Sequence, residues 1–225
     1  MARFLTPVLL LLLLPLASCR LPAAPDVPTT QPSSPNVVEL EQPAADTLVI
    51  AGQRVGPVTA ETRRVDLAAH YGEAALEDAP IPMGEGTTAP GTVVTPGPEQ
   101  QFSVVWQDAS QTRPQLIKDF GPAWQTPEGL GVGIPYSEVE AILGDFQLYG
   151  FAWDYGGTVM LEESQLDQYD GYLLLRLQPA TTAIDQHSEA YQTMMGDQLF
   201  DSSNPSLNVL EPSIYEMLVY FDPLT

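Results

Sequence analysis

The sequence predicts an α+β protein, with an antiparallel sheet and short helices packed on one face. Three observations predict this class. Helical apolar spacing occurs only over short stretches that end at glycine, several runs alternate with a period of two, and glycine-rich turns separate neighbouring runs. A helix of about two turns does not persist alone in water. Each predicted helix must therefore pack against strands.

The clearest helix signal lies within residues 131–159. Ser137 and Glu140 have the S-x-x-E spacing of a capping box, which predicts that the helix starts at Ser137. Val139, Ile142 and Leu143 fall on one apolar stripe. Gly144 follows at the position where a glycine cap ends a helix.

An aromatic run follows this helix. Residues Phe146 to Trp153 predict a strand, and Asp154-Tyr155-Gly156-Gly157 predicts the turn that closes it against Thr158 to Leu161. Since Trp106 and Trp153 both fall on predicted strands, we expect both side chains in the core.

A similar plan occurs about 75 residues earlier. A helix from about Ala60 to Tyr71 ends at Gly72, Gly91-Thr92-Val93-Val94 resembles Gly157-Thr158-Val159-Met160, and each is followed by a strong strand, Phe102–Trp106 or Tyr172–Leu177. A recurrent order at a fixed offset is typical of internal duplication. The sequence is compatible with two tandem similar halves, residues 52–125 and 126–225, and equally with two chance occurrences of a common arrangement.

The remaining body divides into loops and terminal elements. Ala74 to Pro90 is rich in glycine and proline and predicts a long loop, and Asp108 to Gly129 predicts a second irregular connection. Ala183 to Met195 predicts a helix and Asp201 to Pro205 a turn. Ile214 to Phe221 predicts the terminal strand, with its odd-numbered side chains on one face.

The N-terminus carries a separate signal. Arg3 precedes an apolar run from Phe4 to Ala17, which is too short to span a bilayer and has the length of a signal-peptide core. The run ends in Leu16-Ala17-Ser18-Cys19, which resembles the lipobox of bacterial lipoproteins. The alternative is an ordinary secreted protein whose cysteine is incidental.

The lipoprotein resemblance implies that residues 1–18 are a signal peptide removed on export, and that Cys19 carries the lipid that holds the protein on the membrane. Several acyl chains together anchor far more firmly than one. Because Arg20 rather than aspartate follows the cysteine, resemblance to enterobacterial lipoproteins implies the periplasmic face of the outer membrane within the cell envelope. The sequence alone does not decide between inner and outer membrane.

The next segment predicts a spacer. Residues 19–46 are rich in proline, serine and threonine, a composition that favours extended, solvated chain and cannot bury a core. The globular body is therefore predicted to comprise residues 47–225. Because Cys19 is the only cysteine, that body has no disulfide and must be stabilised by its hydrophobic core.

Charge excludes one class of partner. The full chain has 29 acidic and 8 basic residues, and loss of residues 1–18 removes one arginine and no acid, leaving a net charge of −22. Nucleic-acid phosphates require clustered lysine and arginine, so no nucleic-acid partner is expected. A charged partner would be a basic molecule or a cation.

A second resemblance concerns the body. Gly133, Ser137, Val139, Leu143 and Gly144 stand near the G-x-s-x-x-V-x-x-x-L-G signature of beta-lactamase-inhibitor-protein-like folds and small outer-membrane-assembly lipoproteins. Ser137 lies four positions after Gly133, so the spacing departs from the signature. The resemblance implies α+β units that bind other proteins. It names no target.

These observations favour a non-catalytic binding module whose partner is another envelope protein. Tryptophan and tyrosine are enriched at interface hot spots. Trp124 lies between prolines in an irregular segment, so we expect it and Tyr136 to form the partner-binding site. The alternative is that Trp124 fills the seam between the halves.

Two other function classes stay open. An envelope hydrolase acting on cell-wall or polysaccharide material would use carboxylates, one of them with a raised pKa. A calcium-dependent surface module would use the acidic group Glu162, Glu163, Asp167 and Asp170, which lacks the order of a dedicated calcium loop. We assign no catalytic residue, metal ligand or cofactor, since His70 and His187 belong to no recognised motif.

Overall fold

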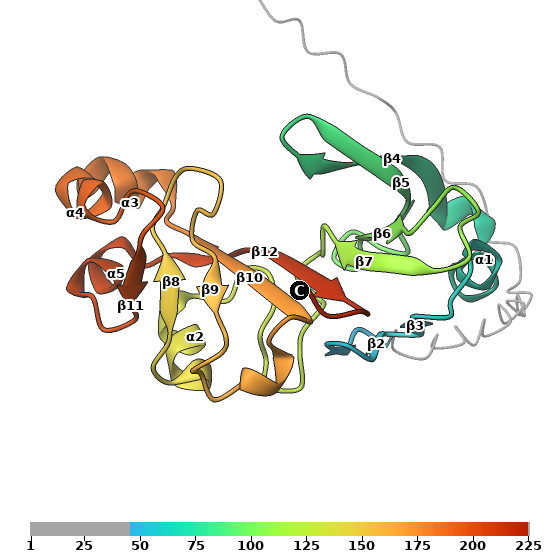
Figure 1. Cartoon of the computed structure of the whole chain (residues 1–225). Helices are drawn as coiled ribbons and strands as arrows, with labels where there is room; N and C mark the ends of the chain where they lie inside the picture. The colour runs from blue at the N-terminus through green and yellow to red at the C-terminus, as the bar shows by residue number, and fades with distance from the viewer. Residues whose placement is uncertain (1–45, 225) are drawn as a thin grey trace, which may run out of the picture. The chain divides into compact units, whose positions relative to one another are not determined.

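The computed structural model describes residues 46–224, all within the second of the two units into which the chain divides, Gln42–Thr225. Strands and short helices alternate along the chain (Figure 1). The strands are β1 (Val49–Ile50), β2 (Arg54–Val55), β3 (Val58–Thr59), β4 (Leu76–Gly84), β5 (Thr87–Val94), β6 (Phe102–Trp106), β7 (Pro114–Lys118), β8 (Gln147–Tyr149), β9 (Val159–Met160), β10 (Leu173–Gln178), β11 (Leu199–Asp201) and β12 (Ser213–Tyr220). The helices are α1 (Arg64–Tyr71), α2 (Tyr136–Leu143), α3 (Thr181–Gln186), α4 (Ser188–Thr193) and α5 (Pro205–Leu210), with 3-10 turns η1 (Glu73–Ala75) and η2 (Asp167–Tyr169). The fold is α+β, as predicted.

The main sheet is antiparallel, with strand order β10-β12-β7-β6-β5-β4. A bridge between Thr158 and Arg176 connects its β10 edge to the smaller sheet β11-β8-β9. Read from β8 to β4, the order is β8-β9-β10-β12-β7-β6-β5-β4. Four strands of the second half, β8, β9, β10 and β12, therefore lie in the reverse of the order β4-β5-β6-β7, with β11 added beyond β8, and β7 and β12 pair at the centre.

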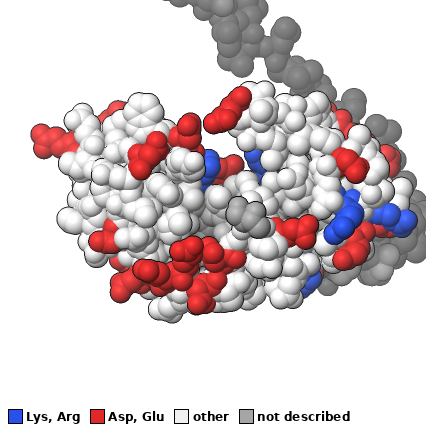
Figure 2. All heavy atoms as spheres, viewed as in Figure 1, with Lys and Arg blue, Asp and Glu red and all other residues white. Residues whose placement is uncertain are grey.

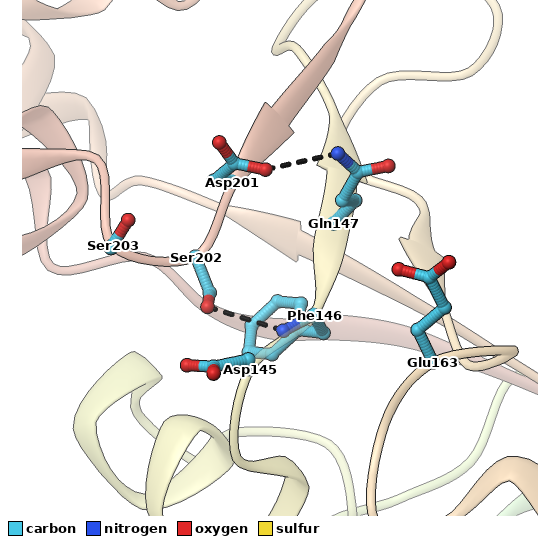
Figure 3. A pocket seen from close by; sticks show the side chains of 7 residues that line it. All are labelled: Asp145, Phe146, Gln147, Glu163, Asp201, Ser202 and Ser203. Atoms are coloured by element: carbon cyan, nitrogen blue, oxygen red, sulfur yellow. Dashed lines mark hydrogen bonds between the residues drawn. The ribbon is translucent and has the colours of Figure 1, made fainter.

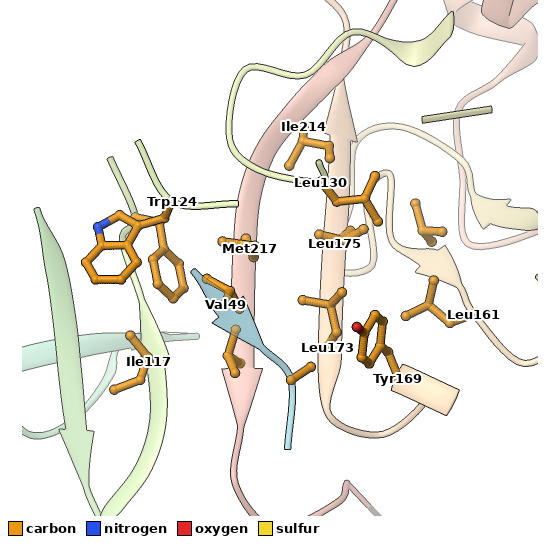
Figure 4. Close-up of a cluster of buried hydrophobic side chains, with 14 of the residues drawn as sticks. Val49, Ile117, Trp124, Leu130, Leu161, Tyr169, Leu173, Leu175, Ile214 and Met217 are labelled. Atoms are coloured by element: carbon orange, nitrogen blue, oxygen red, sulfur yellow. The ribbon is translucent and has the colours of Figure 1, made fainter. Parts of the chain in front are cut away.

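One hydrophobic cluster contains side chains from both halves. It includes Val49 before the first helix, Trp106 and Trp124 from the first half, and Leu175 and Met217 from the second. Figure 4 shows Trp124, Val49, Leu175 and Met217 in one region of this core. Burial of apolar surface on this scale is the main stabilising term of the fold.

Helix α2 forms where expected but starts differently. Its N-cap is Pro135, Ser137 lies inside the helix, and no side chain caps the helix N-terminus, so the predicted Ser137–Glu140 capping box is wrong. The Tyr136 N–H instead donates to the Pro212 carbonyl at 2.7 Å, just before β12. A tertiary contact thus supplies the acceptor that a capping side chain would have supplied. The stripe is confirmed, since Val139 and Leu143 are buried, and Gly144 ends the helix with φ +69°.

Strand β8 is shorter than predicted. It pairs with β9 through Leu148 and Val159, which confirms the hairpin. The chain leaves the strand after Tyr149, however, and Trp153 adopts φ +63° in the connecting loop. Its side chain is 68 % exposed, so the predicted core position of Trp153 is wrong, whereas Trp106 is buried as expected.

The largest error is the predicted loop from Ala74 to Pro90. This segment forms the long hairpin β4–β5, in which Pro80 lies opposite Pro90. Proline cannot donate to a strand ladder, but it is tolerated on edge strands. Because β4 is the edge of the main sheet, its prolines do not prevent pairing with β5.

The limits of several other helices and strands differ from the predicted ones. The first helix begins at Arg64, and β7 forms inside the predicted irregular segment 108–129. The predicted helix Ala183–Met195 is two short helices that meet at His187. Strand β12 is confirmed, with Met217 and Val219 buried, while the bulged register beside Leu177 leaves Tyr215 exposed.

Candidate binding surfaces

Trp124 does not form a surface. Its side chain is 1 % exposed, and its indole N–H donates to the Gln100 carbonyl at 3.0 Å. The ring packs edge-on against Phe102 and Phe120, with centroids 5.1 and 5.9 Å away. The prediction of an exposed anchor is wrong because the proline-flanked segment folds inward and fills the core with this side chain.

Tyr136 is likewise buried, at 2 % exposure. Its hydroxyl contacts the Ser202 carbonyl and donates to Glu140 Oε1 at 3.1 Å. Burial, reinforced by Glu140, raises the pKa of Tyr136. The predicted Trp124–Tyr136 partner site is therefore wrong, since neither residue reaches solvent. Cys19 lies outside the described residues, so its lipidation stays a prediction.

The structure presents a different surface on the main sheet. One face covers the large core, and the opposite face holds only a small cluster in which Val105 and Leu116 are buried and Leu218 and Tyr220 are half-buried. Figure 2 shows the molecule hollowed between the β4–β5 hairpin and the α3–α4 region, with basic side chains inside the hollow. We call this open face of β7, β12 and β10 the recess.

A polar row crosses the recess. The register places Thr158 opposite Arg176 and Arg176 opposite Glu216, so these three side chains share one face. Arg176 Nη1 lies 3.3 Å from Glu216 Oε2, and Lys118 Nζ lies 3.8 Å from Glu216 Oε1. Lys118 Nζ also donates to the Pro82 carbonyl at 3.0 Å, which ties the hairpin to the recess.

The row has unused hydrogen-bonding capacity. Within residues 46–224, Arg176 Nε and Thr158 Oγ1 are both buried and have no hydrogen-bond partner. Buried polar groups are normally satisfied, and an unsatisfied one costs about 1–3 kcal/mol. Lys118 Nζ also lies 3.8 Å from Asp119 Oδ1, whereas within residues 46–224 Arg176 pairs only with Glu216. A further carboxylate would complement the row.

Sequence reasoning missed this surface, although a signal was present. Strand β10 reads LLLRLQ and β12 reads SIYEMLVY, each an apolar run interrupted by one charged residue. A charge within a strand of this kind is costly unless it is paired. The interruptions, Arg176 and Glu216, indicate that the two strands are neighbours.

A second surface is the solvent-facing side of the small sheet. The register places Tyr149 beside Leu199 and Gln147 between Asp201 and Met160, whereas Leu148 points into the core. A cleft of about 310 Å³ borders it, lined by Asp145, Phe146, Gln147, Glu163, Asp201, Ser202 and Ser203 (Figure 3). Gln147 Nε2 donates to Asp201 Oδ1 at 2.9 Å and fixes the cleft wall. We call this surface the small-sheet face.

The hydrolase and calcium alternatives receive no support from the described residues. The carboxyl groups whose pKa is displaced are all displaced downward: Asp66, Glu73, Asp78 and Asp108. None of these four is the acid with a raised pKa that a hydrolase would use. Within residues 46–224, no group of three or more histidine, cysteine, aspartate or glutamate side chains is arranged to hold a metal ion. Among residues 46–224, none of the helices combines the length and the apolar character that spanning a bilayer requires.

Comparisons with known proteins return one similar structure. No protein-family model matches the sequence, and no curated protein matches it significantly. A crystal structure of the uncharacterized protein yfeY from Escherichia coli is similar over 76 % of this chain and 98 % of that chain, at 15 % identity and a TM-score of 0.43. This similarity is too low to carry an argument about function.

Proposed function

We propose that the protein is a lipid-anchored, non-catalytic binding protein of the cell envelope, and that its recess holds a segment of another envelope protein. The lipobox at Cys19 supports the anchor. The recess supports the binding role, because an uncovered sheet face with buried, unsatisfied polar groups is costly for a free protein to maintain.

The recess also indicates the chemistry of its occupant. Leu218 and Tyr220 offer apolar surface beside the polar row. Burial, with Glu216 nearby, raises the pKa of Tyr220, so its hydroxyl stays neutral and able to donate. Within residues 46–224, Arg176 Nε has no hydrogen-bond partner, and guanidinium groups suit recognition of carboxylate. The occupant is therefore a polypeptide segment with an apolar side chain and a neighbouring aspartate or glutamate.

Site-specific photocrosslinking in intact cells tests the recess. A photoreactive amino acid replaces Tyr220 in the full-length protein, and a matched control carries it at the exposed Val209 of α5. We expect one discrete protein adduct from position 220 and none from position 209. Arg176→Gln should reduce that adduct, because it removes the carboxylate-binding donors. Equal adducts at both positions, or none at position 220, would contradict the recess as the binding site.

The anchor is tested separately. Cys19→Ser removes the lipid acceptor, so the protein should leave the membrane fraction and appear in the soluble fraction. Retention in the membrane fraction of a Cys19→Ser form that has lost residues 1–18 would refute lipid anchoring at Cys19.

A further inference from the structure

The small-sheet face ends in a pair of exposed aromatic side chains. Trp153 is 68 % exposed and Tyr155 is 55 % exposed, both on the loop that joins β8 to β9. The Tyr155 ring stacks on Tyr149, with centroids 5.1 Å apart and planes inclined by 30°. Leu199, which is 43 % exposed, lies beside Tyr149 in the sheet. Leu199, Tyr149 and Tyr155 thus form one apolar strip from the sheet to the loop that also carries Trp153.

Unpaired carboxylates border this apolar strip. Asp145, Glu163 and Asp201 line the larger cleft, and an adjoining hollow of about 90 Å³ adds Glu162 while sharing Gln147 and Glu163 with it. None of the ion pairs formed within residues 46–224 involves these four acids. Figure 2 shows acidic side chains gathered over the part of the molecule that contains α2, β8 and β9.

From this arrangement we infer that the small-sheet face is a second binding surface, separate from the recess, and that its occupant is a lysine- or arginine-bearing segment of a partner protein. Charge complementarity decides the occupant. Unpaired carboxylates attract a basic chain and repel an acidic one. The ring faces of Trp153 and Tyr155 accept a cation, at about 0.5–1 kcal/mol for exposed sites.

The apolar strip also fits the methylene part of a lysine or arginine side chain. Lysine and arginine lay their methylene stems along apolar surface while the charged group stays in water. Leu199 and Met160 provide that surface beside the carboxylates. The two surfaces therefore select opposite charges, a carboxylate in the recess and a cation on the small-sheet face.

Tryptophan fluorescence of the full mature protein tests this inference directly. Trp106 and Trp124 are each 1 % exposed, so quenching by acrylamide, a neutral quencher, reports mainly on Trp153. Titration with hexalysine amide should protect Trp153 from acrylamide and saturate, and the affinity should fall as salt is raised. Hexaglutamate should give no protection. Hexalysine that leaves Trp153 equally accessible would overturn the inference.

A matched pair of charge variants separates a specific site from general acidity. Glu163→Gln with Asp201→Asn should weaken hexalysine binding about tenfold, because two contacting charges are lost. Glu85→Gln with Glu99→Gln removes the same charge from residues that do not line the small-sheet face and should leave the affinity unchanged. Equal weakening by both pairs would show that net charge alone attracts the peptide. Arg176→Gln should leave hexalysine binding intact, so failure of the recess proposal and failure of this one are distinguishable.

Discussion

Thr92 and Thr158 hold the same position in the similar stretches 91–94 and 157–160, but their hydroxyls have different environments. Thr92 lies on the core side of β5, where its hydroxyl accepts from the Trp106 indole N–H at 2.9 Å and donates to Asp78 Oδ1 at 2.6 Å. Burial of Asp78 opposes ionisation, but the hydrogen bonds from Thr92 and Arg64 outweigh it and lower the pKa of that carboxyl. Thr158 lies on the recess side, and its hydroxyl has no partner within residues 46–224. A shift of one residue in strand register turns a side chain to the other face of the sheet, and Thr92 and Thr158 differ in this way.

Substitution of these threonines by valine should therefore have different effects. Thr92→Val leaves the buried Trp106 N–H without an acceptor and should lower the free energy of unfolding by about 1–3 kcal/mol. Thr158→Val removes a buried hydroxyl that forms no hydrogen bond within residues 46–224, so the free energy of unfolding should stay the same or rise. Urea denaturation of both variants measures the difference. A similar loss in both would mean that the Thr158 hydroxyl is satisfied in solution.

At the scale of the element, sequence patterns succeeded where local chemistry decides the structure. The α2 stripe with its glycine end, the β8–β9 turn and the apolar strand β12 all formed as predicted. The β4–β5 hairpin could not be predicted in this way, because proline is compatible with a strand only at a sheet edge, and edge position is a property of the whole sheet. The candidate sites failed for a related reason, since the burial of Trp124 and Tyr136 depends on segments far away in sequence.

The prolines of β4 protect the open edge of the main sheet. The Thr95 N–H donates to the Ala75 carbonyl, which makes residues 75 and 95 a hydrogen-bonded pair. In an antiparallel hairpin every second pair is hydrogen-bonded, so Pro80 and Pro82 of β4 occupy non-hydrogen-bonded positions. Their nitrogens face the free edge, where a donor would invite pairing with another chain. Pro80→Val with Pro82→Thr should therefore produce dimers or larger oligomers, measured by light scattering after gel filtration.

The matched control for this edge variant is Pro90→Val, because residue 90 lies on β5, which pairs with β4 and, from Gly91 onward, with β6, rather than on the β4 edge. It should remain monomeric under the same conditions. A monomeric Pro80→Val, Pro82→Thr variant would show that another feature, such as the Lys118 contact with the Pro82 carbonyl, protects the edge.

At the scale of the molecule, the mirrored strand order ties the two halves together. Strands β7 and β12 pair along the central seam, and the main core contains side chains from both sides of it. The recurrence of helix and strands is compatible with the predicted duplication of residues 52–125 and 126–225, which stays a proposal. The shared core has a firmer consequence: neither half can bury its apolar surface without the other.

Residues 46–224 should therefore unfold as one cooperative unit. Far-UV circular dichroism and tryptophan fluorescence should give coincident urea transitions, because loss of either half exposes the core of both. Trp124→Ala should lower the free energy of unfolding by about 3–5 kcal/mol, since it empties a space within the shared core, while the two transitions still coincide. An exposed binding residue would show almost no loss on the same substitution. Separate transitions in the unmodified protein would instead mean that each half is stable by itself and that Trp124 stabilises only one of them.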